Sequence, residues 1–344
     1  MPKKEVVDDW FRKRKDRRLH QTANELFPLL KIGNRQALSS AITLIESNLA
    51  ENQKEARELL LKCLEQPQNS WRIGITGVPG VGKSTFIEEF GRIILEKGLK
   101  LAVLAIDPSS SISGGSILGD KTRMEWLSVQ ENVFIRPTPS GLNLGGVAKH
   151  TRESILLCEA AGYDVILIET VGVGQSETVV HSIVDFFLLL MLAGAGDDLQ
   201  GIKRGIMEMA DALVITKADG ENVLKAKQAR AQYASAMHLF PPKENDWIVP
   251  ALISSSVEQK GLDEVWSTIS SFFTRFSSNG WIAKNRSQQE IQIMNTYLGE
   301  LWLEKIRQHP NYEEYLKQLS QEVLNGKMNG YLAAEELLSK VSFN

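Results

Sequence analysis

The residues best suited to do chemistry form a G-x-x-x-x-G-K-S octet that runs from Gly77 to Ser84. An apolar run precedes it, and a helical pattern with one apolar face follows at once. In this order of strand, glycine loop and helix, backbone N–H groups turn inward and bind phosphate. Lys83 adds a charge for the β- and γ-phosphates, and Ser84 offers a hydroxyl to Mg²⁺. We therefore predict a nucleotide-binding loop formed by Gly77, Val78, Pro79, Gly80, Val81, Gly82, Lys83, Ser84 and Thr85.

A second element indicates the base. The apolar run 213–215 leads into a T-K-x-D element with Thr216, Lys217 and Asp219. The Asp219 carboxylate can accept from both N1–H and the 2-amino group of guanine, a donor pair that adenine lacks. The stem of Lys217 is expected to lie over the base. The next apolar run ends in a serine-rich loop, where a backbone N–H can reach guanine O6: Ser254, Ser255 and Ser256. The sequence therefore favours GTP over ATP.

Three acids are candidate partners of the metal. Glu169 ends a buried apolar run and begins a Glu-x-x-Gly pattern, in which Gly172 can offer its N–H to the γ-phosphate. Asp107 ends another apolar run, and Asp120 closes the Ser/Gly-rich segment after it. Such a segment is typical of a mobile loop over phosphates and metal. The alternative is a structural role, in which Asp107 and Asp120 are helix N-caps and Glu169 caps a helix at a strand end.

A glycine-rich loop, 194–205, follows the most apolar run of the chain. It carries charges of both signs, on Asp197, Asp198, Lys203 and Arg204. This composition suits a segment that reorders when the nucleotide changes. A plain surface loop is the alternative.

Composition limits the class of protein. The chain has 344 residues, 43% of them hydrophobic, which is enough for a large α/β domain with additions. Its net charge of −3 gives no reason to expect nucleic acid or an acidic membrane as partner. The two cysteines, Cys63 and Cys158, are expected to be buried thiols. Because no apolar signal core begins the chain and the run 186–193 is too short to span a membrane, we expect a soluble cytoplasmic protein.

The apolar runs alternate with helical patterns, which predicts an α/β fold with a mainly parallel sheet. The strand candidates are 72–76, 101–106, 132–136, 164–169, 186–193, 212–216 and 247–254. These seven runs predict a P-loop NTPase architecture with about seven strands. Ligands of such sheets bind at the carboxyl ends of the strands, and the candidate residues follow the predicted strand ends. The predicted division is a helical N-terminal extension, a P-loop GTPase domain and a C-terminal helical dimerisation region: 1–66, 67–276 and 277–344.

The last of these regions begins with a predicted hinge, 277–280, and continues with helices over 287–307, 312–324 and 331–341. The first helix is amphipathic, with Ile291, Met294, Leu298, Leu301 and Ile306 at helical spacing. Its apolar face can pack on its own domain or on a second copy of the chain.

Six segments occur in the order and spacing of the MeaB/ArgK-type GTPases, which this chain resembles from about residue 22 to its end: GVPGVGKST, AIDPSS, GGSILGDKTRM, ETVGVGQSE, AGAGDDLQGIKRG and TKAD. The ETVGVGQSE and GDDLQGIKRG segments are specific to that family, whereas the phosphate loop is not. Those proteins are chaperones of adenosylcobalamin-dependent acyl-CoA mutases, above all methylmalonyl-CoA mutase.

The resemblance implies a homodimer whose GTP binding and hydrolysis gate the loading of adenosylcobalamin into the mutase and protect the mutase from inactivation. The cobalamin is then held by the partner mutase. Catalytic roles fall on Lys83, Asp107, Asp120 and Glu169, and the three acids join Ser84 as ligands of Mg²⁺. The loop 194–205 matches a switch that senses the partner, with Asp197, Asp198, Gln200, Lys203 and Arg204.

Two other functions remain open on the residues alone. One is a nickel-insertion accessory GTPase, which needs His or Cys clusters. The other is a kinase linked to amino-acid transport, which needs a phosphoacceptor and usually ATP. The sequence pattern assigns no residue to the attacking water; Gln175 lies close, but three places after Gly172.

Overall fold

The structure is a computed structural model that describes residues 22–67, 69–107, 124–139, 144–170, 176–193 and 204–341. For residues 107, 138–139, 144–148 and 176 it describes the backbone alone. The chain divides into two compact units, with the boundary after Arg286.

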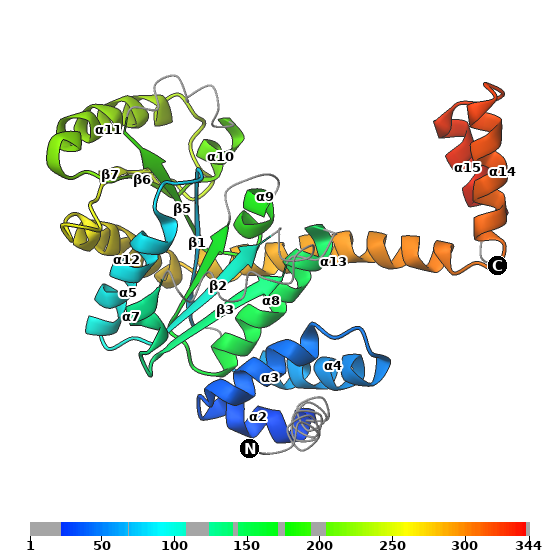
Figure 1. Cartoon of the computed structure of the whole chain (residues 1–344), viewed down its shortest axis with the longest axis horizontal. Helices are drawn as coiled ribbons and strands as arrows, with labels where there is room; N and C mark the ends of the chain where they lie inside the picture. The colour runs from blue at the N-terminus through cyan, green and yellow to red at the C-terminus, as the bar shows by residue number, and fades with distance from the viewer. Residues whose placement is uncertain are drawn as a thin grey trace, which may run out of the picture. The chain divides into compact units, whose positions relative to one another are not determined.

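The first unit is built on a seven-stranded sheet (Figure 1). Its strands are β1 (Trp71–Gly77), β2 (Leu101–Asp107), β3 (Val133–Pro139), β4 (Val165–Thr170), β5 (Phe186–Leu192), β6 (Ala212–Thr216) and β7 (Ala251–Ile253). They lie in the order β3-β2-β4-β1-β5-β6-β7, and every neighbouring pair is parallel. The predicted parallel sheet is confirmed. Because β1 lies between β4 and β5, the loop after β1 emerges at the centre of the carboxyl edge.

The last strand is shorter than the predicted 247–254. Pro250 precedes β7 and has no N–H to give to a ladder. Its carbonyl still accepts from the N–H of Leu213 at 3.0 Å. Trp247 is engaged elsewhere, because its indole N–H donates to the carbonyl of Asp211 at 2.8 Å. The prediction extended the strand too far because an apolar run does not show where pairing begins.

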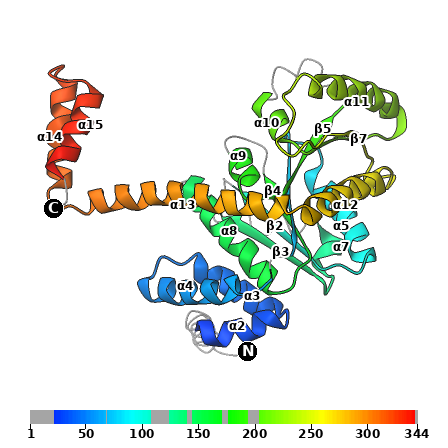
Figure 2. The same ribbon diagram turned by 180° about the vertical axis from the view of Figure 1, so that it is seen from behind.

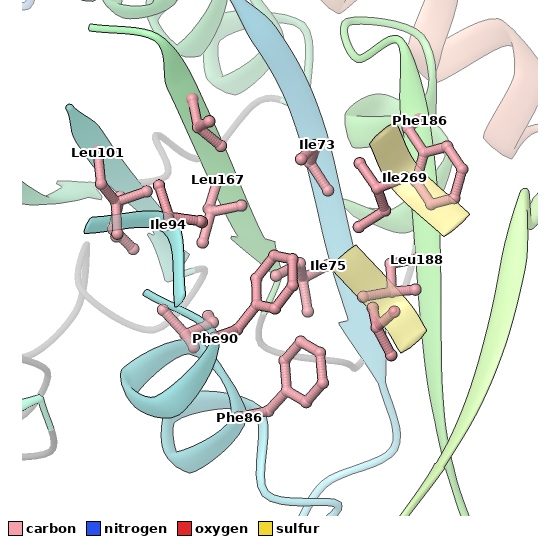
Figure 3. Packing of buried hydrophobic residues seen from close by; sticks show 14 of the residues in the cluster. Ile73, Ile75, Phe86, Phe90, Ile94, Leu101, Leu167, Phe186, Leu188 and Ile269 are labelled. Atoms are coloured by element: carbon pink, nitrogen blue, oxygen red, sulfur yellow. The ribbon is translucent and has the colours of Figure 1, made fainter. Parts of the chain in front are cut away.

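One face of the sheet is covered by α5 (Lys83–Glu96), α7 (Glu125–Ser128) and α12 (Leu262–Ser278). Figure 3 shows Phe86 and Phe90 of α5 pointing toward Ile75 of β1, with Ile269 of α12 between Ile73 and Phe186. Trp71 stacks on Phe273 with ring centroids 4.6 Å apart. The apolar packing of Phe86 and Phe90 holds α5, and with it the end of the phosphate loop, against β1.

The other face carries α8 (Leu144–Ala160), α9 (Ser176–His181), α10 (Arg204–Met209) and, after the short 3₁₀ turn η3 (Gly220–Asn222), α11 (Val223–Met237). Gly74 of β1 allows α9 to approach closely. A Cβ at Gly74 would lie 2.8 Å from Val180 and 3.2 Å from Val184. The helix α9 is therefore held tightly on the central strand.

Three further helices pack outside α8: α2 (Ala23–Lys31), α3 (Arg35–Ile45) and α4 (Ala50–Leu64), as both views of the fold show (Figures 1 and 2). Thr22 and Glu25 form a reciprocal capping box at the start of α2, and Asn34 caps α3. The predicted helical prefix is confirmed. Cys63 of α4 and Cys158 of α8 are free, buried thiols, as expected, and burial raises the pKa of Cys63 to about 12.

Buried charges fasten the amino edge of the sheet. The guanidinium of Arg72 is fully buried and donates to both carboxylate oxygens of Glu159, at 2.8 and 2.9 Å. Arg286 donates to both oxygens of Asp185, at 2.8 and 2.6 Å, and to the carbonyl of Ser70 at 2.6 Å. Paired charges of this kind are tolerated inside a protein, whereas single ones are not. The network joins β1, α8, the residue before β5 and the base of α13.

The helix α13 (Trp281–Arg307) begins before the predicted residue 287, because the Asn279 side chain accepts from the N–H of Trp281 at 3.0 Å. In the second unit it is followed by α14 (Tyr312–Leu324) and α15 (Gly330–Lys340), which pack on each other. Within the described residues, no helix has the length and apolar content required to cross a membrane.

Candidate functional site: a nucleotide-binding loop and its carboxylates

The loop after β1 needs its glycines. A Cβ at Gly77 would lie 2.5 Å from the carbonyl oxygen of Leu190 on β5, so only glycine fits beside that strand. Gly80 and Gly82 have left-handed backbones, with φ of +79° and +93°. Gly82 directly precedes α5, so the loop ends at the N-terminus of a helix. This is the conformation that collects N–H groups around an anion.

Lys83 is a buried cation. Its residue is 9% exposed, and its Nζ donates to the carbonyl of Gly77 at 2.9 Å. Burial lowers the pKa of Lys83, while the charges of Glu169 and Glu177 act in the opposite direction. An ammonium group in such a place is stabilised further by any anion that enters the loop. Lys83 therefore occupies the position that the sequence assigned to a phosphate ligand.

Ser84 and Glu169 meet at the carboxyl edge. The Ser84 hydroxyl lies 3.4 Å from the Oε1 atom of Glu169. The strand order produces this contact, since β4 lies between β1 and β2 and places Glu169 opposite Ile75 and Ala105. A hydroxyl and a carboxylate are hard oxygen ligands of the kind that Mg²⁺ prefers. The residues present thus fit the predicted metal, and Asp107 ends the neighbouring strand β2 at the same edge.

Two threonines fasten the strands around the loop. The Thr216 hydroxyl lies 2.7 Å from the carbonyl of Val81 and 3.2 Å from that of Met191. It therefore ties β6 to the phosphate loop and to β5. Thr170 donates to Thr76 at 2.8 Å, which joins the ends of β4 and β1. Sequence reasoning listed Thr216 only as part of the base-reading element and missed the second pair, because neither contact has a local signature.

Lys217 connects the base-reading element with the phosphate loop. Its Nζ donates to the carbonyl of Gly80 at 2.7 Å. Its backbone is left-handed, with φ of +56°, a conformation that costs a side-chain-bearing residue about 1–3 kcal/mol. The Asn222 side chain compensates by donating to the carbonyl of Lys217 at 2.6 Å. The strained turn places the stem of Lys217 between the two elements, and its Cε atom lies 3.8 Å from the position that a Cβ of Gly82 would take.

Asp219 is held by the serine-rich loop. The Ser255 hydroxyl donates to Oδ2 of Asp219 at 2.7 Å and accepts from the N–H of Glu258 at 3.0 Å. Ser254 exchanges backbone hydrogen bonds with Ile215 and Ala218, so the loop is fastened to the end of β6. Ser256 follows in the turn that leads to α12. The predicted carboxylate and serines are therefore brought together, and Ser255 orients the carboxylate.

Several predicted residues lie outside the described part of the chain: Asp120, Gly172, Asp197, Asp198, Gln200 and Lys203. The side chain of Asp107 is likewise outside it, although its backbone ends β2. Arg204 is described at the start of α10, where it is exposed and pairs with Glu208 at 3.2 Å.

The structure also points to a residue that sequence reasoning passed over. Glu177 in the first turn of α9 is 4% exposed, and its charge acts on Lys83. The signal was present, because Glu177 closes the ETVGVGQSE segment. Of that segment, the motif pattern assigns roles only to Glu169 and Gly172.

The described geometry defines the class. A parallel sheet with a glycine loop after its central strand, a buried loop lysine and a carboxylate at the end of the adjacent strand is that of a P-loop NTPase. The oriented Asp219 carboxylate at the end of β6 favours guanine within this class.

Comparison with known proteins agrees. The sequence profile of the family described as methylmalonyl Co-A mutase-associated GTPase MeaB matches residues 38–311, and the chain belongs to this family. A putative GTPase of Caulobacter vibrioides is 49% identical over 90% of this chain and 95% of its own length. The GTPase ArgK of Escherichia coli is 44% identical over 90% of this chain and 93% of its own. A crystal structure named LAO/AO transport system kinase superposes with a TM-score of 0.75 at 37% identity, covering 93% of this chain and 97% of that one. The protein is a MeaB-family GTPase that hydrolyses GTP.

Base choice is predicted to depend on Asp219. In Asp219→Asn, the amide no longer accepts twice from guanine and can donate to the 2-oxo group of xanthine. Affinity for GTP should fall by more than a hundredfold, since two hydrogen bonds to a charged acceptor are worth about 3 kcal/mol. Affinity for XTP should rise. Calorimetric titration with GTP, XTP and ATP measures both changes. The matched control is Glu221→Gln, an exposed acid two residues along. Equal GTP affinity in Asp219→Asn and wild type would refute the assignment.

Proposed function

We propose that this GTPase is a chaperone of an adenosylcobalamin-dependent acyl-CoA mutase such as methylmalonyl-CoA mutase. GTP binding and hydrolysis gate the loading of adenosylcobalamin, which the mutase holds, and protect the mutase from inactivation. The observation that carries the proposal is the family match over residues 38–311, because that family is described by its association with methylmalonyl Co-A mutase. The match includes the phosphate loop, the carboxylates and the base-reading element.

The site supports the nucleotide half of this function. The loop from Gly77 to Thr85 surrounds the β- and γ-phosphates, and Lys83 exchanges its contact with the Gly77 carbonyl for phosphate oxygens. Ser84 and Glu169, with Asp107 and Asp120, would hold Mg²⁺. When bound, Mg²⁺ neutralises the charge that develops on the phosphates. Gly172 donates its N–H to the γ-phosphate, and Thr216, Lys217, Asp219 and the serines at 254–256 hold the guanine.

The C-terminal unit supports a homodimer. Four apolar side chains of α13 lie on one helical stripe and are between 44% and 62% exposed: Ile291, Met294, Leu298 and Leu301. A contiguous exposed apolar stripe on a helix is typical of an interface with another chain. Ile306, the fifth residue of the predicted face, is buried at 7% exposure. We propose that the stripe packs on a second copy of this chain.

The partner-sensing role is proposed for the loop that contains Asp197, Asp198, Gln200, Lys203 and Arg204. The loop follows β5, which lies between β1 and β6 in the sheet. The strand β1 leads into the phosphate loop. The described end of β5, from which the loop continues, therefore lies beside the strand that leads into the phosphate loop.

The two other functions find less support. In the described residues, no group of three or more His, Cys, Asp or Glu side chains is arranged to hold a metal ion such as nickel. The kinase function has one observation in its favour, which is the name of the solved relative, LAO/AO transport system kinase. A kinase would transfer the γ-phosphate to a protein or small-molecule acceptor, whereas a chaperone GTPase releases inorganic phosphate.

The metal prediction concerns Glu169. We expect Glu169→Gln to lower kcat for GTP hydrolysis more than GTP affinity, because the metal acts mainly on charge that develops during transfer. The variant should also require more Mg²⁺ for half-maximal rate. Steady-state hydrolysis across an Mg²⁺ titration measures both. A wild-type rate with unchanged Mg²⁺ dependence would leave Glu169 with a structural role only.

The chaperone prediction concerns the mutase. We expect a saturating cognate mutase to accelerate GTP hydrolysis, and Lys203→Ala to lose most of that acceleration while GTP binding and slow basal turnover stay nearly unchanged. The measurement is inorganic phosphate release with and without mutase, combined with cobalamin loading of the mutase. Loss of basal activity in the same proportion would place Lys203 among the catalytic residues. Labelled phosphate found on a protein or amino acid, with none released, would favour the kinase.

The dimer prediction concerns Leu298. A carboxylate in the middle of an apolar interface loses its water without gaining a partner, so Leu298→Glu should convert the dimer to a 38.4 kDa monomer. Light scattering after size exclusion gives the mass. Glu300→Gln, an exposed neighbour, serves as control. A monomeric wild type would remove the proposal.

A further inference from the structure

Glu177 is a buried carboxylate with one oxygen that is left without a partner among the described residues. The residue is 4% exposed, and its Oε2 atom has no hydrogen-bond partner among the described residues. Buried carboxylate oxygens without partners are costly, so one that persists in a tightly packed region calls for an explanation. A ligand or water that arrives with the nucleotide would supply the missing partner.

The placement of Glu177 is fixed by the fold. The chain leaves β4 at the carboxyl edge, and α9 then lies against β1 and β4. One turn after Glu177, Val180 is fully buried over Gly74 of β1. Next to it, His181 packs edge-on against Phe187 with ring centroids 5.6 Å apart. The first turn of α9 is therefore held by packing on the strand that leads into the phosphate loop.

Lys83 links this carboxylate to the phosphates. Glu169 lies near the end of β4, and Glu177 lies in the first turn of α9, which packs on β4. The charges of both acids act against the lowering of the pKa of Lys83, the lysine assigned to the β- and γ-phosphates. Their contacts differ. Glu169 is engaged with Ser84 at the metal position, whereas Oε2 of Glu177 is available to accept. A second acid beside the phosphates repels them, so it is unsuited to bind nucleotide; it is suited to accept hydrogen bonds from water.

We propose that Glu177 is a catalytic residue that accepts a hydrogen bond from the attacking water and orients it toward the γ-phosphorus. Oriented water is what hydrolysis of GTP demands of the protein beyond phosphate and metal binding. The proposal deepens the GTPase site and does not depend on the mutase as partner.

The step balances as follows. The water oxygen forms a bond to the γ-phosphorus, and the bond from that phosphorus to the β–γ bridging oxygen breaks. The electron pair of the broken bond stays on the bridging oxygen, which becomes a terminal oxygen of GDP. One proton of the water passes to Oε2 of Glu177 and then to solvent, and the products are GDP and inorganic phosphate.

The test separates orientation of water from binding and from metal coordination. Glu177→Gln has the same shape and removes a buried charge, so it is expected to fold. We expect kcat to fall by about a hundredfold, within the range for loss of a general base. GTP affinity, measured with a fluorescent GTP analogue, should stay the same or increase, and the Mg²⁺ concentration for half-maximal rate should not change. The matched control is Glu153→Gln, a partly buried acid on α8 that pairs with His150, which should keep the wild-type kcat.

A second variant adds an independent readout. Glu177→Ala leaves space for a small carboxylate, so added formate should restore part of its kcat, whereas formate should not affect wild type or Glu177→Gln. A wild-type kcat in Glu177→Gln would overturn the proposal. Equal losses of kcat and GTP affinity would make Glu177 a support of Lys83. A shifted Mg²⁺ requirement would make it a metal ligand. Failure of formate to restore any activity in a folded Glu177→Ala would also count against it.

Discussion

The burial of one ammonium group, that of Lys83, is the constraint on which the site depends. A cation at 9% exposure is tolerated only with acceptors around it, and here they are the Gly77 carbonyl and the charges of Glu169 and Glu177. Each comes from a different element: the end of β1, the end of β4 and the start of α9. The phosphate loop and two neighbouring segments are thus linked at the centre of the sheet through a single side chain.

At the opposite edge of the sheet, buried cations are paired with carboxylates of the protein itself. Arg72 lies in the same strand as Gly77, and two of its guanidinium nitrogens donate to the two oxygens of Glu159. Arg286 and Asp185 repeat the arrangement. Both carboxylate oxygens of each pair accept a hydrogen bond. Beside Lys83, in contrast, the Oε2 atom of Glu177 accepts none among the described residues. One strand therefore carries paired structural charges at its amino end and the charges of the candidate site at its carboxyl end.

The base-reading element shows how strain is used. Lys217 takes a left-handed backbone, and the side chain of Asn222 stabilises the turn by donating to the Lys217 carbonyl. The turn allows Lys217 to reach Gly80 while Asp219, two residues on, faces Ser255. Because the Thr216 hydroxyl also contacts the Val81 carbonyl, the base-reading element and the phosphate loop are fastened to each other by the protein itself. This preorganisation reduces the ordering that binding would otherwise require.

The sequence by itself determined the phosphate loop, the parallel sheet, the helical ends and the family, because glycine spacing, apolar runs and motif order are local properties of the chain. It did not determine where β7 begins, because an apolar run does not show which of its residues form backbone hydrogen bonds with the neighbouring strand. Only the tertiary structure brought Ser84 to Glu169, Ser255 to Asp219 and Glu177 to the surroundings of Lys83. The reason is that these pairs are far apart in the chain, and their distances follow from the order in which the strands lie side by side.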